Sequence, residues 1–220
     1  MRISIFIKSL FLAMPLFVFV SCNNTELTYW ENDNIKSEIP YKDGEISGVA
    51  SWYYENGNKH MESRYEMGSL EGPSIRWFKN GKIQLRENYE NNMLNGSSVA
   101  YNINGVKEEE KNYRNDTLHG KYIRRYPDGG KMIEGSFNMG LYDGNWMYWG
   151  LDGNMTGVGE YRNGKGVQKG WYPNGELKVK THYLNNLKHG QEIHYNPEGK
   201  PVKRIIYEHG EPIREEMLIN

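Results

Sequence analysis

The chain has 220 residues, 25% of them charged, with 27 Lys and Arg against 28 Asp and Glu and a formal net charge of −1. Basic and acidic residues are interspersed, and the longest acidic run, Glu108 to Glu110, is predicted to be a solvated strand edge. Binding a phosphate backbone requires clustered Lys and Arg. The charge pattern therefore argues against nucleic acid as a partner.

The N-terminus has the features of an export signal. Arg2 and Lys8 precede or flank the start of an apolar run from Leu10 to Val20, which is short for a membrane span. The run ends at Cys22, the single cysteine, which cannot form an internal disulfide. We predict a lipoprotein-type signal peptide over 1–21, with Cys22 lipidated and holding the mature chain to the membrane. An ordinary signal peptide with an incidental cysteine is the alternative, because Phe19 replaces the usual Leu.

Three markers repeat in phase along the rest of the chain. The first is a glycine, which recurs at steps of 24, 24, 24, 24, 22 and 24 residues, and the other two are a glycine nine residues before it and an aromatic residue eight residues after it. The turn glycines are Gly57, Gly81, Gly105, Gly129, Gly153, Gly175 and Gly199. We predict a repeat domain over 22–220, with hairpins at about 24–44, 48–68, 72–92, 96–116, 120–140, 144–164, 166–186 and 190–210, and a C-terminal cap over 211–220.

The turns contain a second signal. In three repeats, proline stands two residues before the glycine, as in Pro127-Asp128-Gly129. Proline suits the second position of a type I turn, and the glycine then takes a positive φ. We therefore predict three-residue hairpin loops. This loop length would place Trp77 opposite Ile83 and Ile75 opposite Leu85, so that the strand aromatics and the repeated tyrosines share one face.

These patterns predict an all-β fold, a single extended, twisted antiparallel sheet of about eight tandem β-hairpins. One hairpin cannot offset the cost of ordering its backbone, about 1 to 2 kcal/mol per residue, with the few side chains that it buries. Stacked hairpins shield one another, so stability becomes a sum of contacts between neighbours. Residues from Ile213 to Ile219 would supply a closing strand, and the 22-residue step through Arg162 to Gly166 would introduce a local bend.

The pattern from Gly72 to Lys82, followed by Tyr89, resembles the MORN (membrane occupation and recognition nexus) repeat variant. The chain most resembles the bacterial family of antitoxin-like MORN-variant repeat proteins, named for toxin–antitoxin systems. This resemblance covers essentially the whole mature chain. The resemblance implies an antiparallel hairpin sheet and a role in contact with protein or lipid. It brings no catalytic motif, and the export signal departs from what a cytosolic antitoxin would carry.

Motifs for catalysis, cofactors or metals are not apparent. The six histidines do not have metal-ligand spacing, and the glycines belong to the repeat rather than to a nucleotide-binding or nucleophile motif. We therefore predict no enzyme activity, no cofactor and no metal. The residues that depart from the repeat are aromatics and one arginine on the face expected to be polar, and they form our candidate ligand face: Tyr122, Arg124, Tyr126, Trp146 and Tyr148, with Trp52 and Tyr54 as a smaller group. Alternatively, these aromatics cover one another as cross-strand pairs.

Together these observations indicate a non-catalytic lipoprotein of the cell envelope, at the outer membrane or surface of a Gram-negative bacterium. Its sheet would act as a scaffold that binds a protein, or else a glycan. An antitoxin-like or immunity protein that neutralises a toxin by steric contact is the alternative from a different class.

Overall fold

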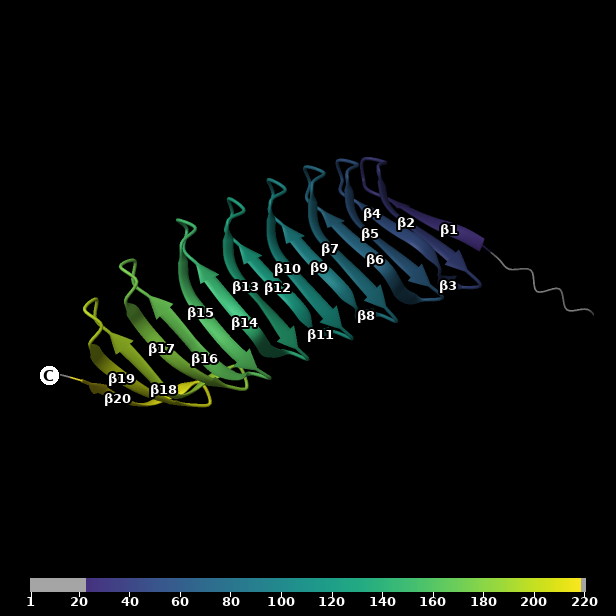
Figure 1. Ribbon diagram of the computed structural model, residues 1–220. Coiled ribbons are helices and arrows are strands. Elements are labelled where there is room, and N and C mark those ends of the chain that lie inside the picture. The colour runs from purple at the N-terminus through teal and green to yellow at the C-terminus, as the bar shows by residue number, and fades with distance from the viewer. Residues whose placement is uncertain (1–22, 219–220) are drawn as a thin grey trace, which may run out of the picture.

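The computed structural model describes residues 23–218, so the predicted signal peptide over 1–21 and the predicted lipidation site Cys22 lie outside the described residues. In the described range the chain forms one open antiparallel sheet of 20 strands without a helix, which confirms the all-β prediction (Figure 1). No helix in this range could cross a membrane. The strands are β1 (Asn23–Tyr29), β2 (Ile35–Lys42), β3 (Glu45–Ile46), β4 (Gly48–Tyr53), β5 (Lys59–Glu66), β6 (Ser69–Trp77), β7 (Ile83–Glu90), β8 (Met93–Leu94), β9 (Gly96–Tyr101), β10 (Lys107–Arg114), β11 (Thr117–Leu118), β12 (Gly120–Arg125), β13 (Lys131–Asn138), β14 (Leu141–Trp149), β15 (Met155–Arg162), β16 (Lys165–Trp171), β17 (Leu177–Leu184), β18 (Leu187–Tyr195), β19 (Pro201–Glu208) and β20 (Glu211–Met217).

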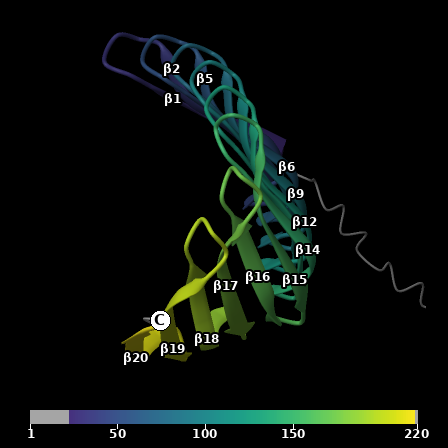
Figure 2. The same ribbon diagram turned by 60° about the vertical axis from the view of Figure 1, so that its left-hand side comes forward.

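Apart from the short segments β3, β8 and β11, which pair only with the strand before them, strands pair with their neighbours in sequence, so the hairpins follow one another along the sheet. The first strand of a hairpin is interrupted in three repeats, which divides it into β3 and β4, β8 and β9, and β11 and β12. β20 pairs with β19 and closes the C-terminal end, as predicted. Figure 2 shows that the sheet twists strongly along its length, as right-handed strand twist requires.

The hairpin loops have the predicted three-residue form. In the loop between β6 and β7, the Gly81 N–H donates to the Phe78 carbonyl at 2.9 Å and the Phe78 N–H donates to the Lys82 carbonyl at 2.9 Å. Gly81 has φ +80°, a conformation that glycine adopts without a steric penalty. This geometry is a type I turn closed by a glycine bulge, and it recurs at the other turn glycines.

A second kind of turn lines the opposite edge of the sheet, where one hairpin connects to the next. These turns have two central residues, both with positive φ, such as Asn91 at +51° and Asn92 at +66°. Such type I′ turns favour Asn, Asp and Gly and match the twist of the strands that they join. The sequence signal is the pairs Asp43-Gly44, Met67-Gly68, Asn91-Asn92, Asn115-Asp116, Met139-Gly140, Asn163-Gly164, Asn185-Asn186 and His209-Gly210.

The predicted distribution of side chains between the two faces is wrong in one respect. Trp77 does lie opposite Ile83, but a bulge follows, so that Arg76 rather than Ile75 lies opposite Leu85. Since neighbouring strand residues point to opposite faces, Trp77 and Tyr89 lie on different faces. We call the two sides the tyrosine face, with Tyr65, Tyr89, Tyr113, Phe137, Tyr161, Tyr183 and Tyr207, and the tryptophan face, with Tyr53, Trp77, Tyr101, Trp149, Trp171 and Tyr195.

The 22-residue step removes a bulge from the repeat. At the junction of the fourth and fifth hairpins, Tyr113 pairs with Leu118 and Glu110 with Ile123, so the later strand contains two extra residues. At the junction of the sixth and seventh hairpins, β15 and β16 pair without interruption from Arg162 and Lys165 to Gly157 and Gly170. The two residues missing from the sequence are therefore those of the bulge.

The sheet is a single layer, so few side chains in the described range are fully covered. The buried apolar residues are Ala50, Ile123, Trp146, Tyr161 and Ile205, and none of the large side chains is less than 2% exposed. Most strand residues are half-buried by neighbours in adjacent strands. Stability is therefore distributed along the array, as in other repeat proteins.

Candidate functional site

Side chains join successive hairpin loops into a ladder. The Tyr54 hydroxyl donates to the Trp77 carbonyl of the next repeat at 2.8 Å, the Tyr126 hydroxyl to the Trp149 carbonyl at 2.9 Å, and the Tyr172 hydroxyl to the Tyr195 carbonyl at 2.8 Å. At these or other junctions, a Trp, Asn or Lys nitrogen donates to the next loop in the same way, through Trp30, Asn32, Asn56, Asn80, Lys82, Asn102 and Asn174. Each such bond fixes the distance between two neighbouring loops.

Among the described residues, only the junction between the sixth and seventh hairpins lacks such a bond. Gly150 occupies the position of Tyr54, Tyr126 and Tyr172, and it has no side chain that could reach the next loop. Asp152 replaces the asparagine donor, and Asn154 is used within its own loop, donating to the Asp152 carboxylate at 2.9 Å. The two loops are thus held together by the strands alone.

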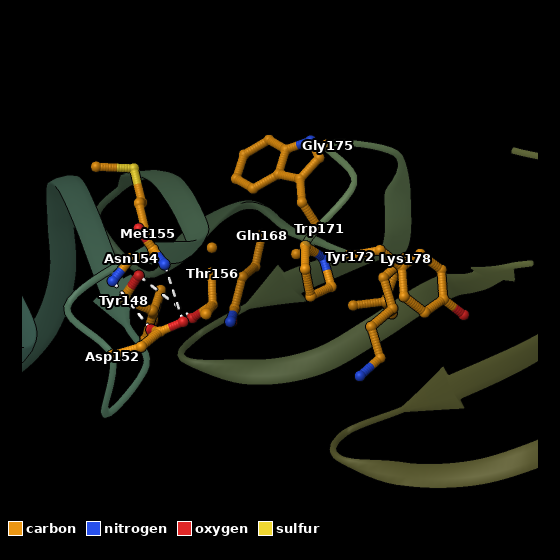
Figure 3. Close-up of a pocket in the computed structure, with 14 residues that line it drawn as sticks. Tyr148, Asp152, Asn154, Met155, Thr156, Gln168, Trp171, Tyr172, Gly175 and Lys178 are labelled. Carbon is orange, nitrogen blue, oxygen red and sulfur yellow. Dashed lines mark hydrogen bonds between the residues drawn. The ribbon is translucent and has the colours of Figure 1, made fainter. Parts of the chain in front are cut away.

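A groove of about 1040 Å³ opens at this junction (Figure 3). Its floor is the paired glycines Gly157 and Gly170 of β15 and β16. Tyr148 of β14 stands at one side of this floor and Val179 of β17 at the other, on the tyrosine face. The other repeats carry a residue with a side chain at the positions that Gly157 and Gly170 occupy here.

This floor differs from Gly135 and Gly159 on the same face. At Gly135 an added Cβ would lie 2.2 Å from the Trp146 ring, and at Gly159 it would lie 2.3 Å from the Tyr161 ring, so both spaces are already filled by aromatic rings. An added Cβ at Gly157 would lie 3.0 Å from the Lys169 carbonyl oxygen and 3.4 Å from the Tyr148 ring, and one at Gly170 would lie 3.2 Å from Val179; both glycines line the groove. Within the groove, the partly exposed backbone is therefore that of Gly170, while Gly157 is buried beside the Tyr148 ring.

Gln168 presents an oriented amide to the groove. Its Oε1 accepts hydrogen bonds from the Tyr161 hydroxyl at 3.3 Å and the Tyr183 hydroxyl at 3.1 Å. Both tyrosine oxygens stay protonated, because burial raises their pKa values, that of Tyr183 to about 12. The carbonyl end is thereby fixed, and the amide nitrogen faces the groove (Figure 3).

The groove also has one acidic and one basic group. Hydrogen bonds from the Asn154 side chain and backbone hold the pKa of Asp152 below its usual value, so it is a carboxylate at neutral pH. Lys178 lies over the Tyr172 ring, with Nζ 5.6 Å from the ring centroid. Figure 3 shows the Trp171 ring on the other side of the ribbon from Gln168 and Lys178. The two charges balance, and the rest of the lining is uncharged and mixes polar side chains such as Thr156 and Gln168 with apolar ones such as Met155 and Val179.

The candidate ligand face predicted from the sequence is only partly open. Trp146, expected to be exposed, is 3% exposed, because its ring stacks on Tyr122 at 5.7 Å and packs against Phe137, Tyr142 and Tyr161. Its Nε1 donates to the Ser136 carbonyl at 3.1 Å. At Trp146 and Tyr122 the structure therefore matches the alternative interpretation, in which these aromatics cover one another.

The other predicted residues lie in several places. Tyr148 belongs to the groove, whereas Tyr126 is part of the loop ladder and Arg124 is exposed one repeat away. Trp52 and Tyr54 lie in the second hairpin, remote from the groove along the sheet. The sequence analysis missed Gln168, Gly157 and Gly170. A signal existed, since Gly170 occupies a position where other repeats have Trp52, Arg76, Ala100, Arg124, Tyr148 and His194.

The described part of the chain holds no group of three or more His, Cys, Asp or Glu residues arranged to bind a metal. The most enclosed ionic contact is at Glu192, which is 4% exposed. Its carboxylate accepts from Thr181 Oγ1 at 2.9 Å, Lys188 Nζ at 2.5 Å and His194 Nε2 at 2.8 Å. With three partners, this group belongs to the packing of the eighth hairpin.

Comparison with known proteins identifies the repeat. Segments 23–43, 46–67, 70–91 and 165–185 match the MORN repeat variant, and the last of them contains Gln168 and Gly170. No curated protein matches the chain. MORN repeats often bind proteins or lipids. Four segments of this sheet are therefore similar to the MORN repeat variant, and the intervening hairpins continue the same strand pattern.

Proposed function

We propose that this protein is a non-catalytic binding scaffold of the bacterial cell envelope, whose tyrosine face holds a protein or a glycan at the junction of the sixth and seventh hairpins. The observation that carries the proposal is the opened junction. Every other pair of neighbouring loops in the described chain is tied by side-chain hydrogen bonds, and this pair leaves a groove with an oriented amide. Concave surfaces with a few convergent polar groups are the usual binding sites of proteins.

The repeat architecture supports a scaffold role. A sheet of stacked hairpins offers a long, regular surface, and local departures from the repeat create individual sites without disturbing the array. Here Gly150, Gly157 and Gly170 are such departures, because each removes a side chain that the repeat normally supplies.

The membrane anchor is a second part of the proposal, and it rests on the sequence before Asn23. β1 begins at Asn23, so a lipid on Cys22 would stand directly before the first edge strand without an intervening linker. The groove, five hairpins further along, would then lie well away from the membrane surface.

The binding role is tested by site-specific photo-crosslinking in cells that produce the full chain. A photoreactive side chain replaces Tyr148 at the groove or Arg76, which has the equivalent strand position three repeats earlier. We expect an adduct from position 148 that is absent from position 76. Identical adducts from both positions, or none from either, would contradict a binding site at this junction.

The anchor is tested separately by labelling cells with radioactive palmitate and comparing wild type with Cys22→Ala. We expect label only in the wild type and release of the variant from the membrane fraction. An unlabelled chain that remains inside the cell would instead favour the antitoxin-like alternative. An adjacent toxin gene is expected only under that alternative.

A further inference from the structure

We propose that the groove at Gly157 and Gly170 is a binding site for a neutral saccharide of one or two rings. This inference rests on the proposed binding role and names the class of its ligand. It follows from the shape of the floor, from the donors and acceptors around it, and from the balance of charge.

The floor favours a flat ring. Gly157 and Gly170 face each other across β15 and β16. Gly157 is buried beside the Tyr148 ring, which stands 3.4 Å from where a Cβ of residue 157 would lie, and Gly170 stays partly exposed beside Val179. A pyranose has one face of C–H groups, which packs on an aromatic ring such as that of Tyr148. Tyrosine suits this contact because it combines an apolar ring with a polar end.

The polar groups suit hydroxyls, which both donate and accept. The Gln168 amide nitrogen is a donor, because its partner oxygen is already occupied by Tyr161 and Tyr183. The Asp152 carboxylate is an acceptor and the Lys178 ammonium a donor. The Gln168 nitrogen has two hydrogens to donate, and each Asp152 oxygen, which already accepts one bond from Asn154, has a second lone pair for a hydroxyl. Because Asp152 and Lys178 offset each other, the ligand itself is expected to be uncharged.

Other ligand classes fit the groove less well. An extended peptide binds a sheet by pairing with a free edge. Here the backbone groups of β15 and β16 are already paired with each other and with β14 and β17. A lipid chain would require an apolar tunnel, whereas Asp152, Thr156, Gln168 and Lys178 line this open groove.

Gln168→Glu is the most direct test. A glutamate keeps an oxygen that accepts from Tyr161 and Tyr183 but replaces the amide donor with a second acceptor. Gln191→Glu is the matched control, because it makes the same chemical change at an exposed position outside the groove. Asp152→Asn and Asp128→Asn form a second pair, since Asp128 accepts a backbone N–H in the preceding repeat in the same way as Asp152.

The probes are cellobiose, maltose and N,N′-diacetylchitobiose, titrated into the full chain and followed calorimetrically. We expect at least one to bind, with a Kd that rises at least tenfold in Gln168→Glu and Asp152→Asn but changes less than twofold in the two controls. Gly170→Tyr, which fills the floor with the residue that the previous repeat carries at this position, should abolish binding, whereas Ala100→Tyr at the equivalent place should not.

Binding of none of the three probes, or binding that Gln168→Glu leaves unchanged, would overturn the saccharide assignment. If the probes fail while crosslinking at position 148 yields a protein adduct, the scaffold role stands and the groove takes a protein. If both experiments fail, the proposed function fails with the inference.

Discussion

The indole of Trp146 lies across Gly135 of the neighbouring strand, where an added Cβ would be 2.2 Å from the ring. Phe137, Tyr142 and Tyr161 surround the same indole at 4.5 to 6.4 Å between ring centroids. The glycine thus makes room for the largest buried side chain of the tyrosine face. In the single-layer sheet this cluster takes the place of a core.

Gly135→Ala should destabilise the fifth and sixth hairpins by about 1 to 3 kcal/mol, because the new methyl group forces the indole out of its position. The measurement is the urea unfolding midpoint, followed by tryptophan fluorescence. In a Trp146→Ala background the same change should cost little, which a double-mutant cycle would show as a coupling energy. An equal loss in both backgrounds would mean that the indole is not the cause.

Asn186, in the turn that connects the seventh and eighth hairpins, bonds across two repeats, whereas Asn92 and Asp116 in the corresponding turns bond across one. Its Oδ1 accepts from the Tyr142 N–H at 2.7 Å and its Nδ2 donates to the Gly140 carbonyl at 2.8 Å, passing Gly164, which has no side chain. Asn186→Asp keeps the first bond and loses the second, so we expect a loss of about 1 to 3 kcal/mol for the unpaired carbonyl.

Asn92→Asp is the control for that change. Asn92 accepts from the Leu70 N–H at 2.7 Å, and Asp116 makes the same bond to Leu94 at 2.7 Å in the next repeat, so an aspartate satisfies this position. Its free energy of unfolding, measured in urea, should remain within about 0.5 kcal/mol of wild type, as for a surface substitution. A loss as large as that of Asn186→Asp would point to a general intolerance of aspartate in these turns.

The missing rung between the sixth and seventh loops can be restored by Gly150→Tyr. Tyr126 at the equivalent position donates to the Trp149 carbonyl, so a tyrosine at 150 should reach the Trp171 carbonyl. We expect a gain of about 0.5 to 1.5 kcal/mol over Gly150→Phe, which adds the ring without the hydroxyl. Amide hydrogen exchange near Trp171 should slow in the tyrosine variant alone. Equal exchange in both variants would show that the hydroxyl makes no bond.

Acid should weaken the eighth hairpin through Glu192. Burial opposes its ionisation, but hydrogen bonds from Lys188, His194 and Thr181 outweigh burial and lower its pKa from the usual value of 4.5. A folded-state pKa below the unfolded value means that the stabilisation is complete above pH 4.5 and is lost as pH falls through the folded-state pKa.

Glu192→Gln should therefore be less stable than wild type at pH 7 and should lose less stability between pH 5 and pH 3, measured by urea unfolding across that range. Glu160→Gln, at an exposed position on the tryptophan face, is the control and should retain the wild-type pH dependence. A Glu192→Gln profile parallel to wild type would exclude Glu192 as the acid-sensitive group.

The sequence by itself determined the hairpins and their loops. Proline and glycine impose their φ preferences on the residues next to them, so Pro127 and Gly129 predict a three-residue loop without knowledge of any distant strand. The fixed phase of the glycines and aromatics then predicts an extended all-β array, because each hairpin must cover its neighbour.

The tertiary structure alone decided which side chains share a face and where the sheet opens. A bulge between Trp77 and Tyr89 moves the tyrosine to the opposite face, and it depends on pairing between strands rather than on local preference. Trp146 is buried because Gly135 on another strand leaves it space. The groove likewise arises only when Gly157 and Gly170 meet across two strands below an untied pair of loops.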